Sequence, residues 1–179
     1  YKLAAEKSKE DIKKELLAVC EKKESKDSIF KYINAPTRLE FLTSIALVQN
    51  YEGLDVNPNY SVDDEGLPTF TASGGFADIE CYDYDYDSYF EVTLMCGRSD
   101  QVNNEIIPIS RHLKEAKEKR RQEAFSVFVA PVIHSDTYEA AEWQKLKNKV
   151  DIVPFCINEF IDKISSTAKP SQILTSSQL

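Results

Sequence analysis

The chain has 179 residues, of which 42% are hydrophobic, and these values predict one globular domain over residues 1–179 with a substantial core. Its four cysteines are far apart and it has only two histidines, which argues against a cysteine–histidine zinc site and an HExxH motif. No segment approaches the length of a membrane span and the charged start lacks a signal-peptide pattern, so we expect a cytoplasmic protein without membrane partners.

The negative charge is concentrated in one segment. The net charge is −8, and residues 51–90 contain ten acidic residues and no lysine or arginine. The rest of the chain carries 22 basic and 20 acidic residues. Because the neutralisation of phosphates supplies most non-specific DNA affinity, this distribution predicts weak binding of DNA by the chain alone.

The chain is predicted to begin with helices. A partial apolar stripe that includes Ile12 and Leu16 predicts a helix over residues 3–23, within an N-terminal helical extension of residues 1–34. The sequence Asn34-Ala35-Pro36-Thr37 is typical of a second helix start, because proline is tolerated in the first turn.

This second helix is apolar over more than half of its circumference, so we expect it to be buried. A glutamate in such a helix, Glu40, usually needs a partner. Glu40 either lies at a solvated edge, pairs with Arg38 or another base, or points toward acidic side chains farther along the chain. A long polar loop is then expected over residues 51–73.

Two short strands are predicted at residues 76–81 and 89–94, because apolar and polar residues alternate with period two. If they pair as a hairpin, the carboxylates of Asp78 and Glu91 come close together and repel each other unless a cation lies between them. Oxygen ligands favour Mg²⁺, which proteins usually hold through one or two carboxylates, waters and substrate phosphate. The pattern therefore predicts a phosphodiester-cleaving site, with a half-solvated acidic sheet face as the alternative.

A helix is expected next, over residues 99–123. Its residues Gln101, Glu105 and His112 are spaced to fall along one stripe, and Pro108 is expected to kink or break the helix. Its end carries the strongest basic cluster of the chain, residues 114–121, which is typical of a solvated helix end.

The remaining elements complete an α/β layout with a mixed β-sheet flanked by helices. An almost continuously apolar run at residues 124–131 predicts a central strand, covered on both faces. We expect a helix at residues 135–149, a strand at 150–155 and a helix at 158–165. Residues 166–179 predict a flexible tail that is rich in serine and glutamine.

The order of these elements resembles the core of the PD-(D/E)xK nucleases, and the motifs over residues 36–160 resemble the AlwI-type restriction endonucleases. The motifs that carry the resemblance are Pro36-Thr37-Arg38-Leu39-Glu40, Asp64-Glu65-Gly66-Leu67-Pro68, Gly74-Gly75-x-x-Asp78-Ile79-Glu80, Glu91-Val92-Thr93-Leu94, Gln101-x-x-x-Glu105-x-x-Pro108-Ile109-x-Arg111-His112-Leu113 and Ile152-Val153-Pro154.

The resemblance implies a set of site residues. The implied catalytic residues are Glu40, Asp78, Glu91, Glu105 and His112. The implied ligands of Mg²⁺ are the carboxylates of Asp78 and Glu91, together with the backbone carbonyl of Val92.

One position departs from the broader nuclease pattern. Thr93 stands where the PD-(D/E)xK pattern has a lysine, so another group must orient water or neutralise charge. His112 is the first candidate and Glu105 the second, and a second metal ion is an alternative. A hydrogen-bonded structural role is the other interpretation of His112.

The resemblance also implies a partner. Full-length members of the family carry a separate DNA-recognition region, for which this chain leaves no room, so it resembles the small cleavage subunit of a heterodimeric type IIS enzyme. Such a subunit cuts one strand of double-stranded DNA in the prokaryotic cytoplasm and depends on a large recognition and nicking subunit. A standalone nuclease is the main alternative.

Two other functions fit parts of the sequence. The alternate aspartates Asp83, Asp85 and Asp87 are typical of a Ca²⁺ loop, although Ser88 replaces its glycine and Leu94 its final glutamate. A carboxylate-pair glycosidase would use Asp78 and Glu91, but it leaves Gln101, Glu105 and His112 without a role.

Overall fold

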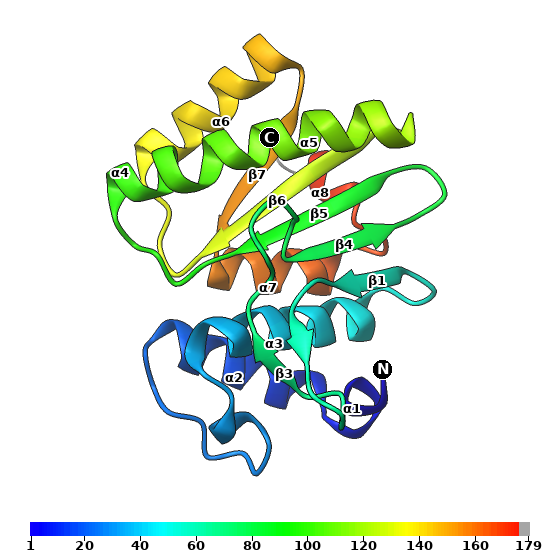
Figure 1. The fold of residues 1–179 in the computed structure, drawn as a ribbon, viewed down its shortest axis with the longest axis vertical. Helices are drawn as coiled ribbons and strands as arrows, with labels where there is room; N and C mark the ends of the chain where they lie inside the picture. Colours follow the sequence, from blue (N-terminus) through cyan, green and yellow to red (C-terminus); the bar gives the residue numbers. More distant parts are fainter. Residues whose placement is uncertain (176–179) are drawn as a thin grey trace.

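The computed structural model describes residues 1–175 and has one central sheet of five strands, in the order β1-β4-β5-β6-β7 (Figure 1). β1 pairs antiparallel with β4 and β4 with β5, whereas β5, β6 and β7 run parallel. The predicted α/β class with a mixed central sheet is therefore confirmed. The strands are β1 (Asp55–Pro58), β4 (Ile79–Tyr82), β5 (Asp87–Val92), β6 (Ala124–Ala130) and β7 (Asp151–Cys156).

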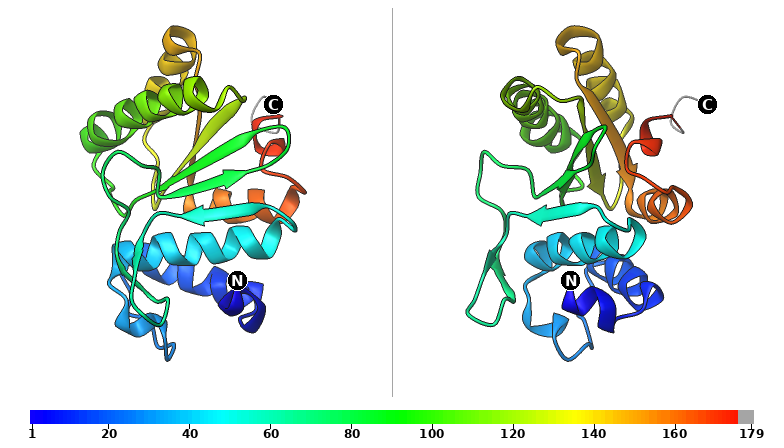
Figure 2. Two further views of the ribbon diagram at one scale, coloured as in Figure 1. Left: turned by 45° about the vertical axis from the view of Figure 1, so that its right-hand side comes forward. Right: turned by 90° about the vertical axis from the view of Figure 1, so that its right-hand side faces the viewer.

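Helices cover both faces of this sheet (Figure 2). Side chains of β6 alternate between two cores, with Phe125 and Val127 on the side of α3 and Phe128 on the side of α5. Every residue of β6 is buried, as predicted for a strand covered on both faces. The helices are α1 (Lys2–Glu6), α2 (Lys9–Cys20), α3 (Ala35–Asn50), α4 (Arg98–Asp100), α5 (Ile107–Arg120), α6 (Ser135–Asn148), α7 (Ile157–Ser166) and α8 (Gln172–Thr175).

The first predicted helix, residues 3–23, is two helices in the structure. Ser8 ends α1 and caps α2, because its Oγ accepts a hydrogen bond from the backbone N–H of Asp11 at 3.1 Å. Serine favours such a cap over a position inside a helix. α2 then buries Ile12, Leu16 and Val19 against α3 and α7.

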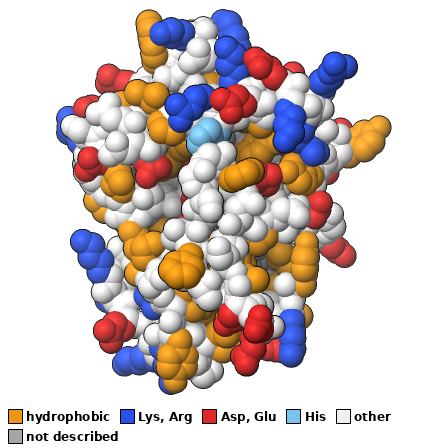
Figure 3. All heavy atoms as spheres, viewed as in Figure 1, with side chains coloured by type: hydrophobic (Ala, Val, Ile, Leu, Met, Phe, Trp, Pro, Cys, Tyr) orange, Lys and Arg blue, Asp and Glu red, His pale blue; other side chains and the backbone are white. Residues whose placement is uncertain are grey.

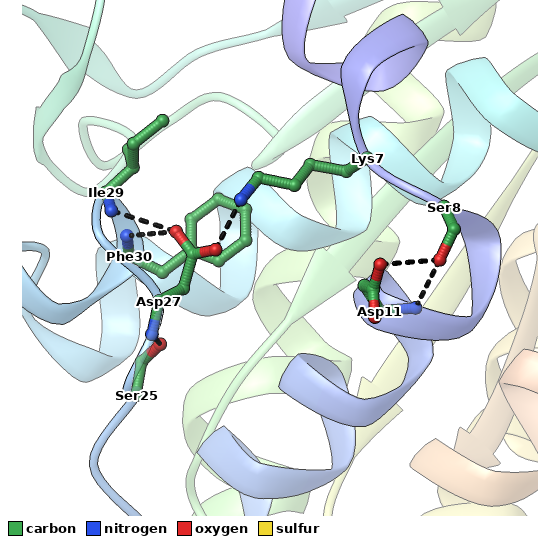
Figure 4. A network of polar contacts seen from close by, with 7 residues as sticks. All are labelled: Lys7, Ser8, Asp11, Ser25, Asp27, Ile29 and Phe30. Atoms are coloured by element: carbon green, nitrogen blue, oxygen red, sulfur yellow. Dashed lines mark hydrogen bonds and ion pairs between the residues drawn. The ribbon is translucent and has the colours of Figure 1, made fainter.

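The loop between α2 and α3 is held by a carboxylate at its centre (Figure 4). The Oδ1 of Asp27 accepts hydrogen bonds from the N–H groups of Ile29, at 2.8 Å, and Phe30, at 3.3 Å. Lys7 forms an ion pair with the same carboxylate, which ties the loop to the end of α1. The loop therefore has a defined shape, with a short 3₁₀ helix, η1, at Phe30–Tyr32.

α3 forms where predicted and is buried from Thr37 to Leu47. Asn34 caps it by accepting a hydrogen bond from the N–H of Thr37 at 3.2 Å, and proline lies in its first turn. Its buried position between α2 and the sheet places Glu40 in the interior, where it is only 4% exposed.

The expected polar loop of residues 51–73 contains strands. β1 is the outermost strand of the main sheet, and β2 (Ser61–Val62) pairs antiparallel with β3 (Pro68–Phe70) as a separate two-stranded sheet. The prediction missed these strands because Asn57, Pro58 and Asp63 are residues typical of turns. Pairing with β4 is what makes β1 a strand.

The hairpin prediction is confirmed, with shifted bounds. β4 pairs with β5 in the register Ile79↔Phe90, and β5 begins two residues earlier than expected. The earlier start is explained by Asp87, which is 1% exposed and forms an ion pair with Arg120 of α5. This ion pair between a buried carboxylate and an exposed guanidinium keeps this end of the hairpin against α5.

The predicted helix of residues 99–123 is a continuous run of α4, the π-helix η2 (Gln101–Ile106) and α5. Pro108 does not break it, because it lies in the first turn of α5, directly after the π-helix. In a π-helix the backbone hydrogen bonds join residues five apart instead of four, so each turn contains more residues than an α-helical turn. α5 ends at Arg120, since Arg121 adopts the left-handed conformation with φ 55°.

The C-terminal segment differs from the expected flexible tail over its described part. α8 places Ile173 fully inside the core beside α7 and the sheet. Leu174 also packs against this core, and the serine-rich composition concealed both apolar contacts. Residues 176–179 of the predicted tail lie outside the described part of the chain. None of the helices within residues 1–175 has the length and apolar character that crossing a membrane requires.

Candidate active site

Four acidic side chains interact at one end of the sheet. There the start of α3, the start of β4, the end of β5 and the π-helix η2 come together. We call the side chains that these elements contribute the carboxyl cluster. The cluster consists of Glu40 from α3, Asp78 from the residue before β4, Glu91 from β5 and Glu105 from η2.

Asp78 and Glu91 are brought together as the hairpin predicted. The register Ile79↔Phe90 places them opposite each other. The Oδ2 of Asp78 accepts a hydrogen bond from the N–H of Val92 at 2.7 Å, and the N–H of Asp78 donates to the carboxylate of Glu91. These reciprocal bonds fix both side chains on rigid strands, a requirement for a precise site.

The electrostatics of this pair favour the protonated forms. Burial, followed by the negative charge of Glu40, raises the pKa of Asp78 to about 8, although the Val92 N–H lowers it in part. Burial and the charges of Asp78 and Glu105 raise the pKa of Glu91 well above its ordinary value. The direction is the one that buried like charges produce. Binding of a cation would therefore stabilise the ionised forms of these carboxyls.

Glu40 joins this cluster rather than pairing with a base. Its Oε2 accepts a hydrogen bond from the N–H of Ala72 at 2.9 Å, and burial raises its pKa to about 7. Arg38 instead donates to the carbonyl of Lys23 at 3.0 Å. Of the alternatives left open by the sequence, the structure supports a third carboxylate directed toward the hairpin.

Glu105 reaches the cluster from the other face of the sheet. Burial raises its pKa, and a hydrogen bond from Thr93 lowers it in part. The residue at the position of the missing lysine is therefore a neutral donor to a carboxylate of the cluster. This arrangement favours Glu105 as the group that orients water.

The predicted stripe of Gln101, Glu105 and His112 does not hold as one face. Gln101 is fully buried away from the cluster, where its Nε2 donates to the carbonyls of Val132 at 2.7 Å and Met95 at 3.2 Å. Each π turn advances fewer degrees per residue than an α turn, so residues beyond η2 are rotated from the positions that α-helical spacing predicts.

His112 is half-buried on α5, and within the described chain it makes no hydrogen bond or ion pair. The charges that raise the pKa values of Asp78 and Glu91 come from other carboxyls. A catalytic role for His112 stays a prediction, as does metal binding by the carbonyl of Val92. The N–H of Val92 is engaged by Asp78.

The donor set fits a small hard cation. No three His, Cys, Asp or Glu side chains among residues 1–175 are gathered as a ready-made metal cage. Mg²⁺ does not require such a cage, since one or two carboxylates with waters and substrate phosphate usually hold it. Asp78 and Glu91, whose pKa values are raised by burial and then by neighbouring negative charge, meet that requirement.

The alternative Ca²⁺ loop does not form at residues 83–87. Asp87 is buried and paired with Arg120, and Asp85 is paired with Lys169 at 3.4 Å. Two of the three alternate aspartates thus already have basic partners. The alternate aspartates lie in the turn between β4 and β5, and ion pairs of Asp85 and Asp87 hold that turn in place.

The structure is thus a mixed sheet between two helical layers, with facing carboxyls on a hairpin at one end. The model of the AlwI restriction endonuclease family matches residues 2–162, and the chain belongs to this family of DNA endonucleases. No curated protein matches the chain.

Solved structures give a consistent fold. The small subunit, R.BspD6I2, of the heterodimeric restriction endonuclease R.BspD6I is similar, with a TM-score of 0.68 and 23% sequence identity. The likeness covers 90% of this chain and 85% of that one.

Proposed function

We propose that the chain is the small, cleavage-only subunit of a heterodimeric restriction endonuclease, acting in the prokaryotic cytoplasm. The observation that carries the proposal is the carboxyl cluster, in which Asp78 and Glu91 face each other across the hairpin. Membership of the restriction endonuclease family supports the reaction, and the named assembly of the similar solved structure supports the subunit.

In this proposal Asp78 and Glu91 hold Mg²⁺ and Glu40 supports them from α3. Mg²⁺ supplies Lewis-acid stabilisation of the negative charge that develops on the phosphate. Its binding is favoured because the charges that burial and mutual repulsion now penalise gain a counter-ion. The two strands and their reciprocal hydrogen bonds keep the ligands in place without reorganisation.

The hydrolytic step needs an acceptor for one proton of the attacking water. The water oxygen bonds to phosphorus and gives up a proton to a carboxylate. The bond from phosphorus to the leaving oxygen breaks, and that oxygen takes up a proton from solvent water. We assign this role to Glu105, because burial raises its pKa and a hydrogen bond from Thr93 holds its carboxylate. His112 is the second candidate. One such site cuts one strand of double-stranded DNA.

The subunit role is tested by adding the partner back. A duplex that carries the recognition site, labelled on each strand, is incubated with the purified chain, with the large subunit, and with both. Mg²⁺ is present in all reactions and absent from a control. We expect one strand to be cut by the large subunit alone, both strands by the mixture, and neither by this chain alone.

Two outcomes count against the proposal. Efficient site-specific cutting by this chain alone would favour a standalone nuclease. A mixture that still leaves the second strand intact would remove the cleavage role itself.

A further inference from the structure

A second charged feature lies at the same end of the sheet as the carboxyl cluster. The loop between α2 and α3, the start of α3 and Leu94, next to Thr93, enclose a cavity of about 630 Å³. It lies on the side of α3 away from Glu40, because residues two apart on a helix face in different directions. Its charged lining residues are Lys22, Lys23, Lys31, Arg38 and a single acid, Glu24.

The arginine of this cavity is incompletely satisfied. Arg38 is 6% exposed, and its guanidinium donates one hydrogen bond, from Nη2 to the carbonyl of Lys23. Its Nε is shielded from solvent and has no partner. No carboxylate in the described chain forms an ion pair with it. A buried guanidinium normally has a carboxylate or phosphate partner, because an unpaired buried charge is costly.

The backbone at the start of α3 also favours an anion in this cavity. The cavity includes Ala35 at the N-terminus of α3, a helix of 16 residues with no acidic residue in its first turn. The positive end of a helix dipole favours an anion. A planar guanidinium beside it suits the paired oxygens of a phosphate.

The other basic cluster of the chain is poorly placed for the cleavage site. α5 runs away from the carboxyl cluster, and Arg120 at its far end is paired with Asp87 at the start of β5 (Figure 1). Lys117 is paired with Glu123. In Figure 3 acidic side chains gather over the β2–β3 hairpin, whereas basic ones occur at the lower left, over the α2–α3 loop. The cavity is therefore a basic feature beside the cleavage end.

We infer that this cavity binds a backbone phosphate of the DNA duplex next to the one that is cleaved. Arg38 supplies the paired hydrogen bonds, and Lys22 and Lys31, both exposed, supply long-range attraction. The site positions the strand in the carboxyl cluster and offsets the repulsion between phosphates and carboxylates. The inference rests on the proposed function, since it takes the substrate from it.

The first test is a binding experiment without Mg²⁺, so it does not depend on cleavage. The Nε–H resonance of Arg38 is followed by NMR while the full chain is titrated with a short duplex or with inorganic phosphate. We expect the duplex to shift this resonance at low salt. The double variant Lys22→Gln/Lys31→Gln, at two exposed positions, should lower the affinity for the duplex about tenfold, as expected for the loss of roughly one phosphate contact.

A matched control keeps the result specific. Lys14→Gln/Lys149→Gln removes the same charge from exposed positions, and Lys149 shares with Lys22 a left-handed backbone, with φ 57° and 60°. It should change the affinity less than about twofold, because neither lysine lines the cavity. Equal weakening by both variants, or no shift of Arg38 with the duplex, overturns the inference. So does saturation by inorganic phosphate at the same phosphate concentration, which indicates a free-anion site.

The second test places the phosphate. Single neutral methylphosphonate linkages are introduced on either side of the scissile phosphate, and the complete heterodimer cuts each duplex. One linkage should slow the wild-type complex about tenfold and slow the Lys22→Gln/Lys31→Gln complex by a smaller factor, because Arg38 is still present but the attraction of the two lysines is lost. Equal slowing of both complexes at every position contradicts the inference. Failure of the complex to cut any duplex instead contradicts the proposed function, while the NMR result stands.

Discussion

Glu40→Gln is expected to stabilise the protein and to abolish its cleavage activity. The pKa of Glu40 is about 7, against 4.5 for an ordinary glutamate. Between these values the native state holds a proton that the unfolded state has lost, so the free energy of unfolding falls as pH rises. At about 1.4 kcal/mol per pH unit, the penalty reaches at most ~3.5 kcal/mol above pH 7. A glutamine removes the penalty and keeps an oxygen for the N–H of Ala72.

The assay is thermal or urea unfolding from pH 4 to pH 8 without divalent ions, together with strand-cleavage rates. We expect no gain at pH 4 and a gain of about 1–3 kcal/mol at pH 8, equivalent to roughly 3–10 °C in Tm. Saturating Mg²⁺ should shrink the gain, and the exposed Glu118→Gln control should show none. If Glu40→Gln has the same stability as the wild type at every pH, or cuts at the normal rate, Glu40 is not a buried carboxylate with a raised pKa that serves the cluster.

Other substitutions probe the remaining assignments. Asp78→Asn or Glu91→Gln should lower cleavage at least about 1000-fold, equivalent to about 4 kcal/mol of transition-state stabilisation, while circular dichroism stays unchanged; a near-normal rate would place the site elsewhere. Glu105→Gln should slow single-turnover cleavage more than His112→Asn, because Glu105 interacts with Asp78 and Glu91, and the reverse order would identify the imidazole as the active group. Ile173→Ala should cost about 2–4 kcal/mol in urea unfolding, and a cost below about 1 kcal/mol would show that α8 detaches readily.

The parts of the fold that sequence predicted well have strong local signals. The alternation around Ile79 and Phe90 predicted the hairpin, and the apolar run of β6 predicted a central strand. The facing positions of Asp78 and Glu91 followed from the hairpin, because strand period and pairing leave little choice of face.

The parts that it missed depend on contacts made across the fold. β1 contains Asn57 and Pro58, and only its pairing with β4 makes it a strand. Nothing in residues 101–106 signals a π-helix, yet that helix turns Gln101 into the core and disrupts the expected stripe. The hydrogen bond between Glu40 and Ala72 joins residues 32 positions apart, which no local pattern reveals.

The two outer strands of the sheet, β1 and β7, each contain a proline, Pro58 and Pro154. Proline lacks an N–H, so Pro58, which is partly exposed, removes a donor from the row that β1 offers to a passing chain, whereas Pro154 is buried within β7. In the proposed heterodimer, the chain exists for a time before it meets its partner. Pro58 acts against edge-to-edge aggregation in that period. Pro58→Val should thus raise the tendency of the unassembled chain to aggregate, as light scattering can measure, more than it alters cleavage by the proposed complex with its partner.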